Sequence, residues 1–431
     1  MEMPKIYVNP PRSEWPALTA RCTRQEEEIG ERVAAILAEV RTGGDAALRR
    51  IVRRIEGYLP ETFEVTRERR AEAAKAVSPQ LKAALEQAKA NIEAFHRAQL
   101  PAQVEVETMP GVRCVQRAVA IGRAGLYIPG GKAPLFSTVL MLALPARIAG
   151  CREVILCTPC GRDGRIAPEI LYAADLCGVD RVFALGGAQA VAAMAYGTES
   201  IPRVDKIFGP GNRYVTKAKQ LAGAADVAVD LPAGPSEVLV LADEDARPEF
   251  AAADLLSQAE HGDDSQAVLV CRSKEFARRA IASVGEQAAR LSRREAIGNS
   301  LANSRIVVFS DPDEQIAFAD AYAPEHLIVA MRDAWDAAAR ITAAGSVFIG
   351  GYSPESAGDY ASGTNHTLPT GGWARAYSGV NTESFMRKIT YQELTRGGLE
   401  ALAPTITAMA EAEGLDAHAN AVRIRTEGGA R

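Results

Sequence analysis

Short apolar runs alternate with longer segments of helical periodicity through the middle of the chain, and this alternation limits the possible folds most strongly. The runs are rich in Val and Ile. For example, Val154–Cys157 is followed by a helical stretch over Pro168–Cys177 and then by Val182–Leu185. Such alternation is typical of βαβ units, in which successive strands pair in parallel. A further strand is expected at Lys206–Phe208, followed by a helix over Asn212–Ala222.

The same alternation restarts after Leu231–Pro235, a Gly- and Pro-rich stretch that is the best internal boundary. The expected strands of this second series are Val238–Leu241, Ala267–Cys271, Ile306–Phe309, Leu327–Ala330 and Val347–Ile349. Residues 25–100 carry apolar residues at helical spacing, and another helical segment begins at about Leu399. The sequence therefore predicts an α/β fold with two doubly wound parallel-sheet units and small helical parts at both ends.

Composition and charge narrow the class of protein further. Hydrophobic residues make up 47% and charged residues 24% of the chain, as in an ordinary globular protein. The net charge of -5 and the even spread of Lys and Arg do not favour a nucleic-acid or membrane surface. We expect a cytoplasmic protein. The N-terminus lacks a secretory signal, no run reaches roughly 18 apolar residues, and the seven cysteines do not suggest a disulfide framework.

Three glycine-rich turns follow apolar runs, at residues 122–131, 186–187 and 209–212. The last two open predicted helices, whose free N–H groups suit a phosphate group. No full G-x-G-x-x-G pattern occurs, so three tight strand-to-helix turns explain the glycines equally well. The pair Cys157 and Cys160 is a poor zinc signal, because a second C-x-x-C pair is missing.

Four of the five histidines lie beside turns or other polar residues. His261 closes the helix that begins at Pro248, and Gln258 lies three residues earlier on the same helical face. This geometry suits two metal ligands. The alternative is a histidine that interacts favourably with the helix C-terminus, with Gly262 as the cap.

Glu325 and His326 are adjacent at the entry to the apolar run Leu327–Ala330. A carboxylate and an imidazole offer two groups for proton transfer. Because neighbouring residues of a strand point to opposite faces, a turn or bulge must aim both side chains at one site. A polar pair at the edge of the sheet is the alternative.

Two further segments hold candidate residues. Asp359 and His366 lie in a long loop rich in small residues, and such loops on an α/β scaffold commonly carry the functional site. Glu413 and His418 lie in the tail, which taken alone predicts two short surface helices broken at Gly414.

Taken together, these segments resemble the histidinol dehydrogenase family over nearly the whole chain. The matching motifs are GLYIPGG at 125–131, GGAQA at 186–190, GPGN at 209–212, AGPSEVLV at 233–240, SQAEH at 257–261, PEHL at 324–327, SPESAGDYASGTNH at 353–366 and EGLDAHANAV at 413–422. Several long motifs in a fixed order are far more specific than any one of them alone.

The resemblance implies two Rossmann-like domains of the aldehyde-dehydrogenase type. Residues 21–126 with 236–380 would form a discontinuous domain that carries the metal and catalytic site, and residues 127–235 would bind NAD. Residues 1–20 with 381–393 would form a small extension, and residues 394–431 a helical tail. Members of this family are homodimers, in which the tail of each subunit reaches the active site of its partner.

The resemblance also implies roles for single residues. The expected zinc ligands, which would also contact the substrate, are Gln258, His261, Asp359 and His418. Further substrate contacts are expected from Ser236, His326, His366 and Glu413. The expected NAD contacts are Tyr127, Gln189 and Asn212. Glu413 and His418 would act in trans.

The implied reaction is the oxidation of L-histidinol to L-histidine through enzyme-held L-histidinal, with two NAD reduced, at the end of histidine biosynthesis. His326 would take the hydroxyl proton, Glu325 would activate the water that attacks the aldehyde, and zinc would orient the substrate. One alternative is a paralogue that oxidises another polyol or amino alcohol, such as a sulfopropanediol. Glu355, His366 and Glu413 argue against it, because acidic groups and an imidazole suit a cationic substrate better than a sulfonate. A cysteine-dependent aldehyde dehydrogenase and a non-catalytic NAD-binding protein are further alternatives.

Overall fold

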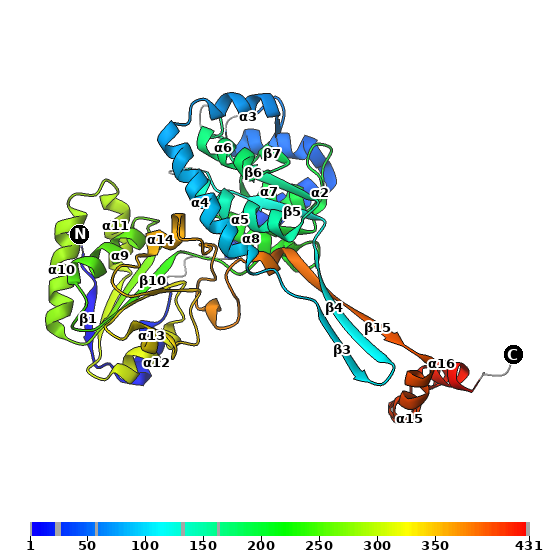
Figure 1. Cartoon of the computed structure of the whole chain (residues 1–431). Coiled ribbons are helices and arrows are strands. Elements are labelled where there is room, and N and C mark those ends of the chain that lie inside the picture. The colour runs from blue at the N-terminus through cyan, green and yellow to red at the C-terminus, as the bar shows by residue number, and fades with distance from the viewer. Residues whose placement is uncertain (1, 22–26, 57–58, 131–133, 162–163, 428–431) are drawn as a thin grey trace.

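The computed structural model describes residues 2–21, 27–56, 59–130, 134–161 and 164–427. Two six-stranded sheets form the centres of two lobes, and a three-stranded sheet extends away from them as an arm (Figure 1). The predicted α/β class with two parallel-sheet units is therefore confirmed. Among the described helices, none combines the length and the apolar character that crossing a membrane requires.

The first sheet, sheet A, has the strand order β1-β12-β11-β10-β13-β14, and all neighbouring strands are parallel. Its strands are β1 (Lys5–Val8), β10 (Glu237–Ala242), β11 (Gln266–Cys271), β12 (Arg305–Val308), β13 (His326–Ala330) and β14 (Ser346–Ile349). Helices cover one face, namely α9 (Pro248–Ala259), α10 (Lys274–Ala288) and α11 (Arg294–Ala302). The other face is covered by α1 (Trp15–Leu18), α12 (Pro312–Tyr322) and α13 (Ala334–Ala338).

Burial on both faces explains why the strands of sheet A are continuous apolar runs. Val238 and Val240 of β10 belong to the core under α9 and α10, whereas Leu239 and Leu241 belong to the core on the opposite face. Every residue of β10, β11 and β13 is buried.

The second sheet, sheet B, has the order β2-β7-β6-β5-β8-β9 and is parallel except for β2. Its strands are β2 (Glu64–Val65), β5 (Arg123–Tyr127), β6 (Glu153–Thr158), β7 (Arg181–Ala184), β8 (Lys206–Phe208) and β9 (Ala228–Val229). One face carries α3 (Arg67–Ala74), α4 (Pro79–Arg97), α5 (Phe136–Ala149) and α6 (Pro168–Leu176). The other carries α2 (Glu27–Glu56), α7 (Gly187–Tyr196) and α8 (Arg213–Gly223).

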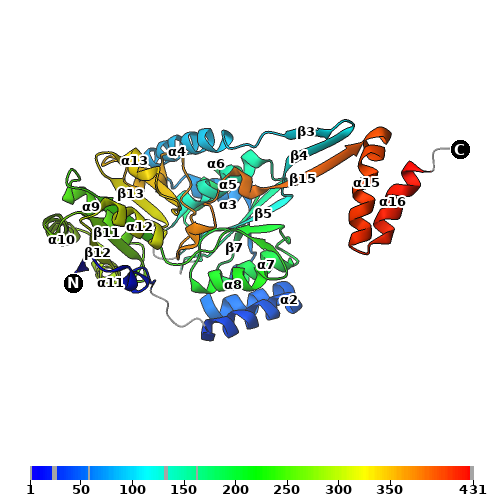
Figure 2. The same ribbon diagram turned by 90° about the horizontal axis from the view of Figure 1, so that it is seen from below.

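The arm is antiparallel and was not expected from the sequence. Its order is β15-β4-β3, with β3 (Val104–Met109), β4 (Val112–Ala120) and β15 (Met386–Leu394). Two helices follow at its far end, α15 (Arg396–Ala412) and α16 (Asp416–Thr426) (Figures 1 and 2). The remaining short elements are η1 (Arg12–Glu14), α14 (Glu355–Tyr360), η2 (Trp373–Arg375) and η3 (Thr382–Phe385).

The observed packing differs from the division of the chain that the resemblance implied. Helices α2, α3 and α4 lie within the expected first domain, 21–126 with 236–380, but they pack on α7 and α8, on α6 and on α5 around sheet B. The expected extension 1–20 contributes β1 to sheet A. Helix α2 belongs with sheet B because its apolar side chains, such as Val33 and Leu48, share a core with α7. Helical periodicity in the sequence does not reveal which sheet a helix packs on.

Candidate active site

Glu325 and His326 lie side by side at the amino end of β13. Helix α12 ends at Tyr322, and Ala323 adopts the left-handed conformation with φ 51°, which turns the chain into the strand. Both side chains are buried and meet the same residue of β10. Glu325 Oε2 accepts a hydrogen bond of 2.8 Å from Glu237 N, and His326 Nδ1 lies 3.3 Å from Glu237 O. The turn thus brings a carboxylate and an imidazole into one place, with 3.6 Å between Glu325 Oε2 and His326 Nδ1.

The last turn of α9 supplies Gln258 and, just beyond it, His261. Gln258 is fully buried, and the surrounding groups orient its amide so that the nitrogen donates to both oxygens of Glu355, at 2.5 and 3.1 Å. Its amide oxygen accepts from Glu237 N at 3.2 Å, and because an amide oxygen has two lone pairs, one remains for another partner. His261 is exposed and lies in the turn after the helix.

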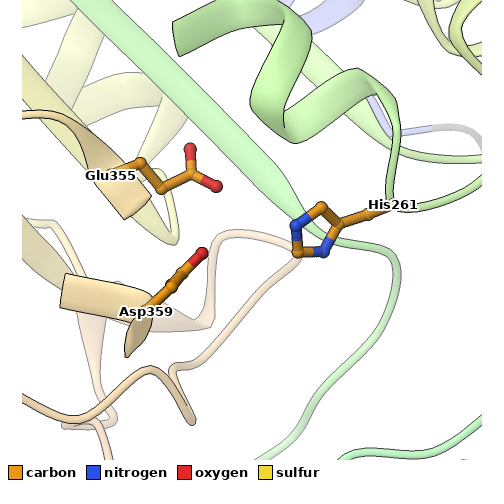
Figure 3. Close-up of side chains that lie close together, drawn as sticks. All are labelled: His261, Glu355 and Asp359. Carbon is orange, nitrogen blue, oxygen red and sulfur yellow. The ribbon is translucent and has the colours of Figure 1, made fainter. Parts of the chain in front are cut away.

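Helix α14 presents two carboxylates to His261. Glu355 and Asp359 are four residues apart and so share one helical face. The ligand atoms of His261, Glu355 and Asp359 all lie within 4.8 Å of one another, and the three side chains point toward a common space (Figure 3). Asp359 Oδ1 is also 3.4 Å from His326 Nε2. The candidate ligands therefore adjoin the Glu325–His326 pair.

His366 connects this site to the lobe of sheet B. Its Nδ1 lies 2.8 Å from the Asp359 carbonyl oxygen, and its Nε2 lies 3.0 Å from Oγ1 of Thr138 on α5. Both ring nitrogens thus have protein partners. Ser236 lies immediately before β10 and is half-buried, and its carbonyl accepts from Gln266 N at 3.1 Å.

The three expected NAD contacts line a single cavity of about 900 Å³ at the carboxyl ends of the sheet B strands. Tyr127 ends β5, and its hydroxyl accepts from Gly187 N at 3.1 Å. Gln189 donates to Glu56 Oε1 at 3.1 Å, and Asn212 caps α8 by accepting from Tyr214 N. Strands β6 and β8 lie on opposite sides of β5. From β5 the sheet continues to β6 and β7 in one direction and to β8 and β9 in the other, so the cavity lies at the switch point where such folds bind ligands.

One glycine that contacts the main chain of Tyr127 is required by its surroundings. Gly209 has φ 122°, and a Cβ there would lie 2.1 Å from the Tyr127 carbonyl oxygen. No other residue therefore fits the turn after β8. Gly131, the last residue of the GLYIPGG motif, lies outside the described residues.

Glu413 and His418 are not brought to the site within this chain. Both are exposed, Glu413 at the end of α15 and His418 on α16. Figure 2 shows these helices beyond the arm, on the opposite side of the molecule from α9.

Comparison with known proteins agrees with the motifs. The family model described as histidinol dehydrogenase matches residues 19–426. Histidinol dehydrogenase of Bacteroides fragilis strain YCH46 is 54% identical over 427 residues, which cover 98% of this chain and 99% of that protein. A crystal structure of histidinol dehydrogenase from Elizabethkingia anophelis matches with a TM-score of 0.97 and 46% identity, covering 99% of each chain. The chain belongs to the histidinol dehydrogenase family. It is therefore an NAD-dependent oxidoreductase.

Buried charges give the groups of this histidinol dehydrogenase family member unequal proton affinities. Burial opposes the charge of His326, but Glu325, Glu355 and Asp359 outweigh it and raise its pKa well above the usual value. Burial also raises the pKa of Glu355 well above its usual value. For Asp359 burial acts in the same direction, but the hydrogen bond and charge of His326 prevail, so its pKa is lowered. Two carboxylates on one helix thus differ, with Asp359 the readily ionised one.

The donor set fits the zinc ion that the histidinol dehydrogenase family implies. Imidazole nitrogen, carboxylate oxygen and amide oxygen are the ligand types that His261, Asp359 and Gln258 offer, and zinc accepts nitrogen and oxygen ligands. Two carboxylates facing each other in a buried place repel unless a proton or a cation lies between them. The close approach of Glu355 and Asp359 beside His261 is consistent with such a cation.

Two buried carboxylates of this site were not predicted from the sequence. Glu355 was expected only as an acidic group near the substrate, although its spacing of four residues from Asp359 could have marked it as a candidate ligand. Glu237 lies within the AGPSEVLV motif, just before an apolar run, but its role was not predicted, because its partners are distant in sequence.

Proposed function

We propose that this protein oxidises L-histidinol to L-histidine through enzyme-held L-histidinal, with the reduction of two NAD and with one zinc ion per active site. The observation that carries the proposal is the convergence of Gln258, His261 and Asp359 with the Glu325–His326 pair at the amino end of sheet A. The sheet B cavity supplies a separate place for NAD, with Tyr127, Gln189 and Asn212 as contacts.

In the first oxidation, His326 accepts the hydroxyl proton of the substrate while the carbinol hydride passes to NAD. Its Nδ1 faces the Glu237 carbonyl, so Nε2 is the nitrogen that takes the proton. His326 must be unprotonated before it can accept this proton. A cation held by Asp359 would offset part of the negative charge that raises the pKa of His326, and would favour the neutral form.

In the second oxidation, Glu325 takes a proton from the water that attacks the aldehyde. The hydrate then loses a hydride to a second NAD, and the carboxylate of the product forms. Glu325 is held by Glu237 N and is buried, and both features keep it directed at the reacting carbon. Retention of the aldehyde between the two steps prevents its side reactions in water.

Zinc, when bound, would anchor the amino and imidazole nitrogens of the substrate and so fix its orientation. Gln258, His261 and Asp359 of one subunit, together with His418 of the partner subunit, would hold it. Ser236 and the partner subunit's Glu413 would contact the substrate. His366 would do so only by exchanging one of its present partners, Thr138 or the Asp359 carbonyl.

The arm supports a homodimer in which the tail acts in trans. Helices α15 and α16 leave Met409, Leu415 and Ile424 exposed, and few of their side chains are buried. An apolar surface on two helices at the end of an arm suits burial against a second subunit. We propose that the second subunit is another copy of this chain.

Titration of purified protein with L-histidinol tests the proposal. With excess NAD, two NADH should form per histidinol, and a chelator should abolish turnover until zinc is returned. One NADH per substrate, or full activity without metal, would contradict it. Oxidation of a sulfopropanediol in place of histidinol would support the paralogue instead.

A further inference from the structure

A buried ion pair lies directly behind the acid–base pair and has no role in the scheme above. Glu237, the first residue of β10, is 1% exposed. Its Oε1 accepts from Arg21 Nε at 2.9 Å and its Oε2 accepts from Arg21 Nη2 at 2.9 Å. Gly371 N adds a third hydrogen bond of 2.8 Å to Oε1. A two-point bond between guanidinium and carboxylate fixes both the distance and the angle of the partners.

The main chain of Glu237 contacts three groups of the proposed site. Its N–H donates to Glu325 Oε2 at 2.8 Å and lies 3.2 Å from the Gln258 amide oxygen. Its carbonyl oxygen lies 3.3 Å from His326 Nδ1. The place of this one residue therefore sets the place of both proton-transfer groups and of one proposed zinc ligand.

Arg21 also holds the segment that delivers Glu325 and His326. Its Nη2 donates to the Tyr322 carbonyl at 2.7 Å, and its guanidinium carbon lies 3.7 Å from the centre of the Tyr322 ring. Tyr322 ends α12, and Ala323 follows with φ 51°. A left-handed conformation at a residue other than glycine is strained, so the contacts around it must maintain it.

We infer that Arg21 and Glu237 are positioning residues for the oxidation. Together they fix the positions of Glu325 and His326 relative to the substrate. The inference rests on the proposed function. Arg21 joins the two segments that carry the site, the start of β10 through Glu237 and the end of α12 through Tyr322. Without the guanidinium, the buried Glu237 carboxylate loses its partner charge, and both segments can shift.

The effect should appear in turnover and not in substrate binding. Arg21→Ala should lower kcat by about 100-fold, the loss expected when catalytic groups move by roughly 1 Å. The KM values for histidinol and NAD should stay within about threefold, and zinc content should not change, because Gln258 keeps its two hydrogen bonds to Glu355 when Glu237 shifts. Arg21→Lys should fall between the wild type and Arg21→Ala, because ammonium keeps the charge but not the two-point geometry.

Chemical rescue can separate positioning from general packing. Arg21 lines a cavity of about 310 Å³ bordered by Lys5, Tyr7 and Arg305, which gives small cations a route to the missing side chain. Millimolar guanidinium chloride should restore much of the kcat of Arg21→Ala, and equal sodium chloride should not. The matched control is Arg181→Ala, because Arg181 makes a two-point bond to Glu64 in the other lobe, at 3.0 and 2.7 Å. That variant should keep its kcat and show no rescue.

The outcomes are distinct. A wild type that forms no NADH overturns the proposed function, whereas a folded Arg21→Ala with wild-type kcat overturns only this inference. A loss of kcat that guanidinium does not restore, or an equal change in KM, would show a general structural role and also overturns it. If thermal unfolding shows that Arg21→Ala does not fold, Glu237→Gln replaces it. That variant keeps the shape of the side chain, and an unchanged kcat in it contradicts the inference.

Discussion

The two sheets share a doubly wound topology but offer opposite ends for function. Sheet B places its cavity at the carboxyl ends of β5 and β8, where α/β sheets commonly bind ligands. Sheet A gathers its polar residues at the amino ends of β10 and β13, where Glu237 and His326 are the first residues of their strands. The switch-point rule therefore locates one site and not the other.

The sheet A site and the sheet B cavity also differ in the kinds of residue that form them. The sheet A site is built from buried ionisable side chains, including Glu237, Glu325, His326 and Glu355. The sheet B cavity is lined by turns and helix starts, where Tyr127 accepts from Gly187 N, and by α2, which adds Arg32, Arg54 and Glu56. Changes in the first should therefore alter chemistry and metal binding, and changes in the second should alter cofactor affinity.

The largest expected effect is on the second oxidation. Glu325→Gln should slow the oxidation of histidinal by about 10²–10⁴-fold, the range of a lost general base, while the first hydride transfer slows far less. Single-turnover measurements that start from histidinol and from histidinal can separate the two steps. Equal rates of both steps in the variant and the wild type would show that Glu325 is not the base.

Metal affinity should be the next most sensitive property. Glu355→Gln should weaken zinc binding by about 10–100-fold, because its carboxylate lies beside His261 and Asp359 and orients Gln258. Competition with a chromogenic chelator measures the affinity. Glu249→Gln, at the other end of α9, is the control and should bind zinc as the wild type does.

A smaller effect is expected in the sheet B cavity. Tyr127→Phe removes the hydroxyl that accepts from Gly187 N, and one neutral hydrogen bond contributes about 0.5–1.5 kcal/mol. The KM for NAD should rise by up to about tenfold, with kcat and zinc content unchanged. Tyr196→Phe on α7, outside the cavity lining, should leave the KM for NAD unaltered. A fall in kcat alone would contradict the separation of the two places.

The smallest effect concerns stability. Burial raises the pKa of Asp254 on α9 to about 7, above the value of about 3.9 in an unfolded chain. The folded state therefore favours the protonated acid, and this stabilisation is complete below about pH 4 and lost as the pH rises toward 7. The Asp254→Asn variant has no carboxyl group to titrate at this position, so it does not lose this stabilisation as the pH rises. Its stability relative to wild type, measured by urea unfolding, should increase between pH 4 and 7, and a constant difference would contradict the assignment.

The sequence predicted the strands of both sheets well, because strands buried on both faces are apolar runs such as Val238–Leu241 and Ala267–Cys271. It did not predict the arm, since β3 is largely exposed, β4 is only partly buried, and β15 pairs with β4 across more than 250 residues. Packing of α2 on α7 was missed for the same reason, because long-range contacts leave no local pattern.

The residues of the candidate site were likewise predicted only in part. Motifs identified Gln258, His261, Glu325, His326 and Asp359, and the structure places these side chains together. The roles of those residues remain predictions. Arg21 lies in no motif, and the motif that contains Glu237 does not reveal its partner, because a buried ion pair between residues 216 positions apart is a property of the fold.

The proposed function depends on one cation beside the Glu325–His326 pair at the amino end of sheet A. Crystallography of the zinc-loaded protein, with anomalous data collected on either side of the zinc absorption edge, tests it directly. We predict a single strong peak per site bordered by Gln258, His261 and Asp359. A zinc peak elsewhere, or those three side chains bound to no metal in an active crystal, would contradict the account.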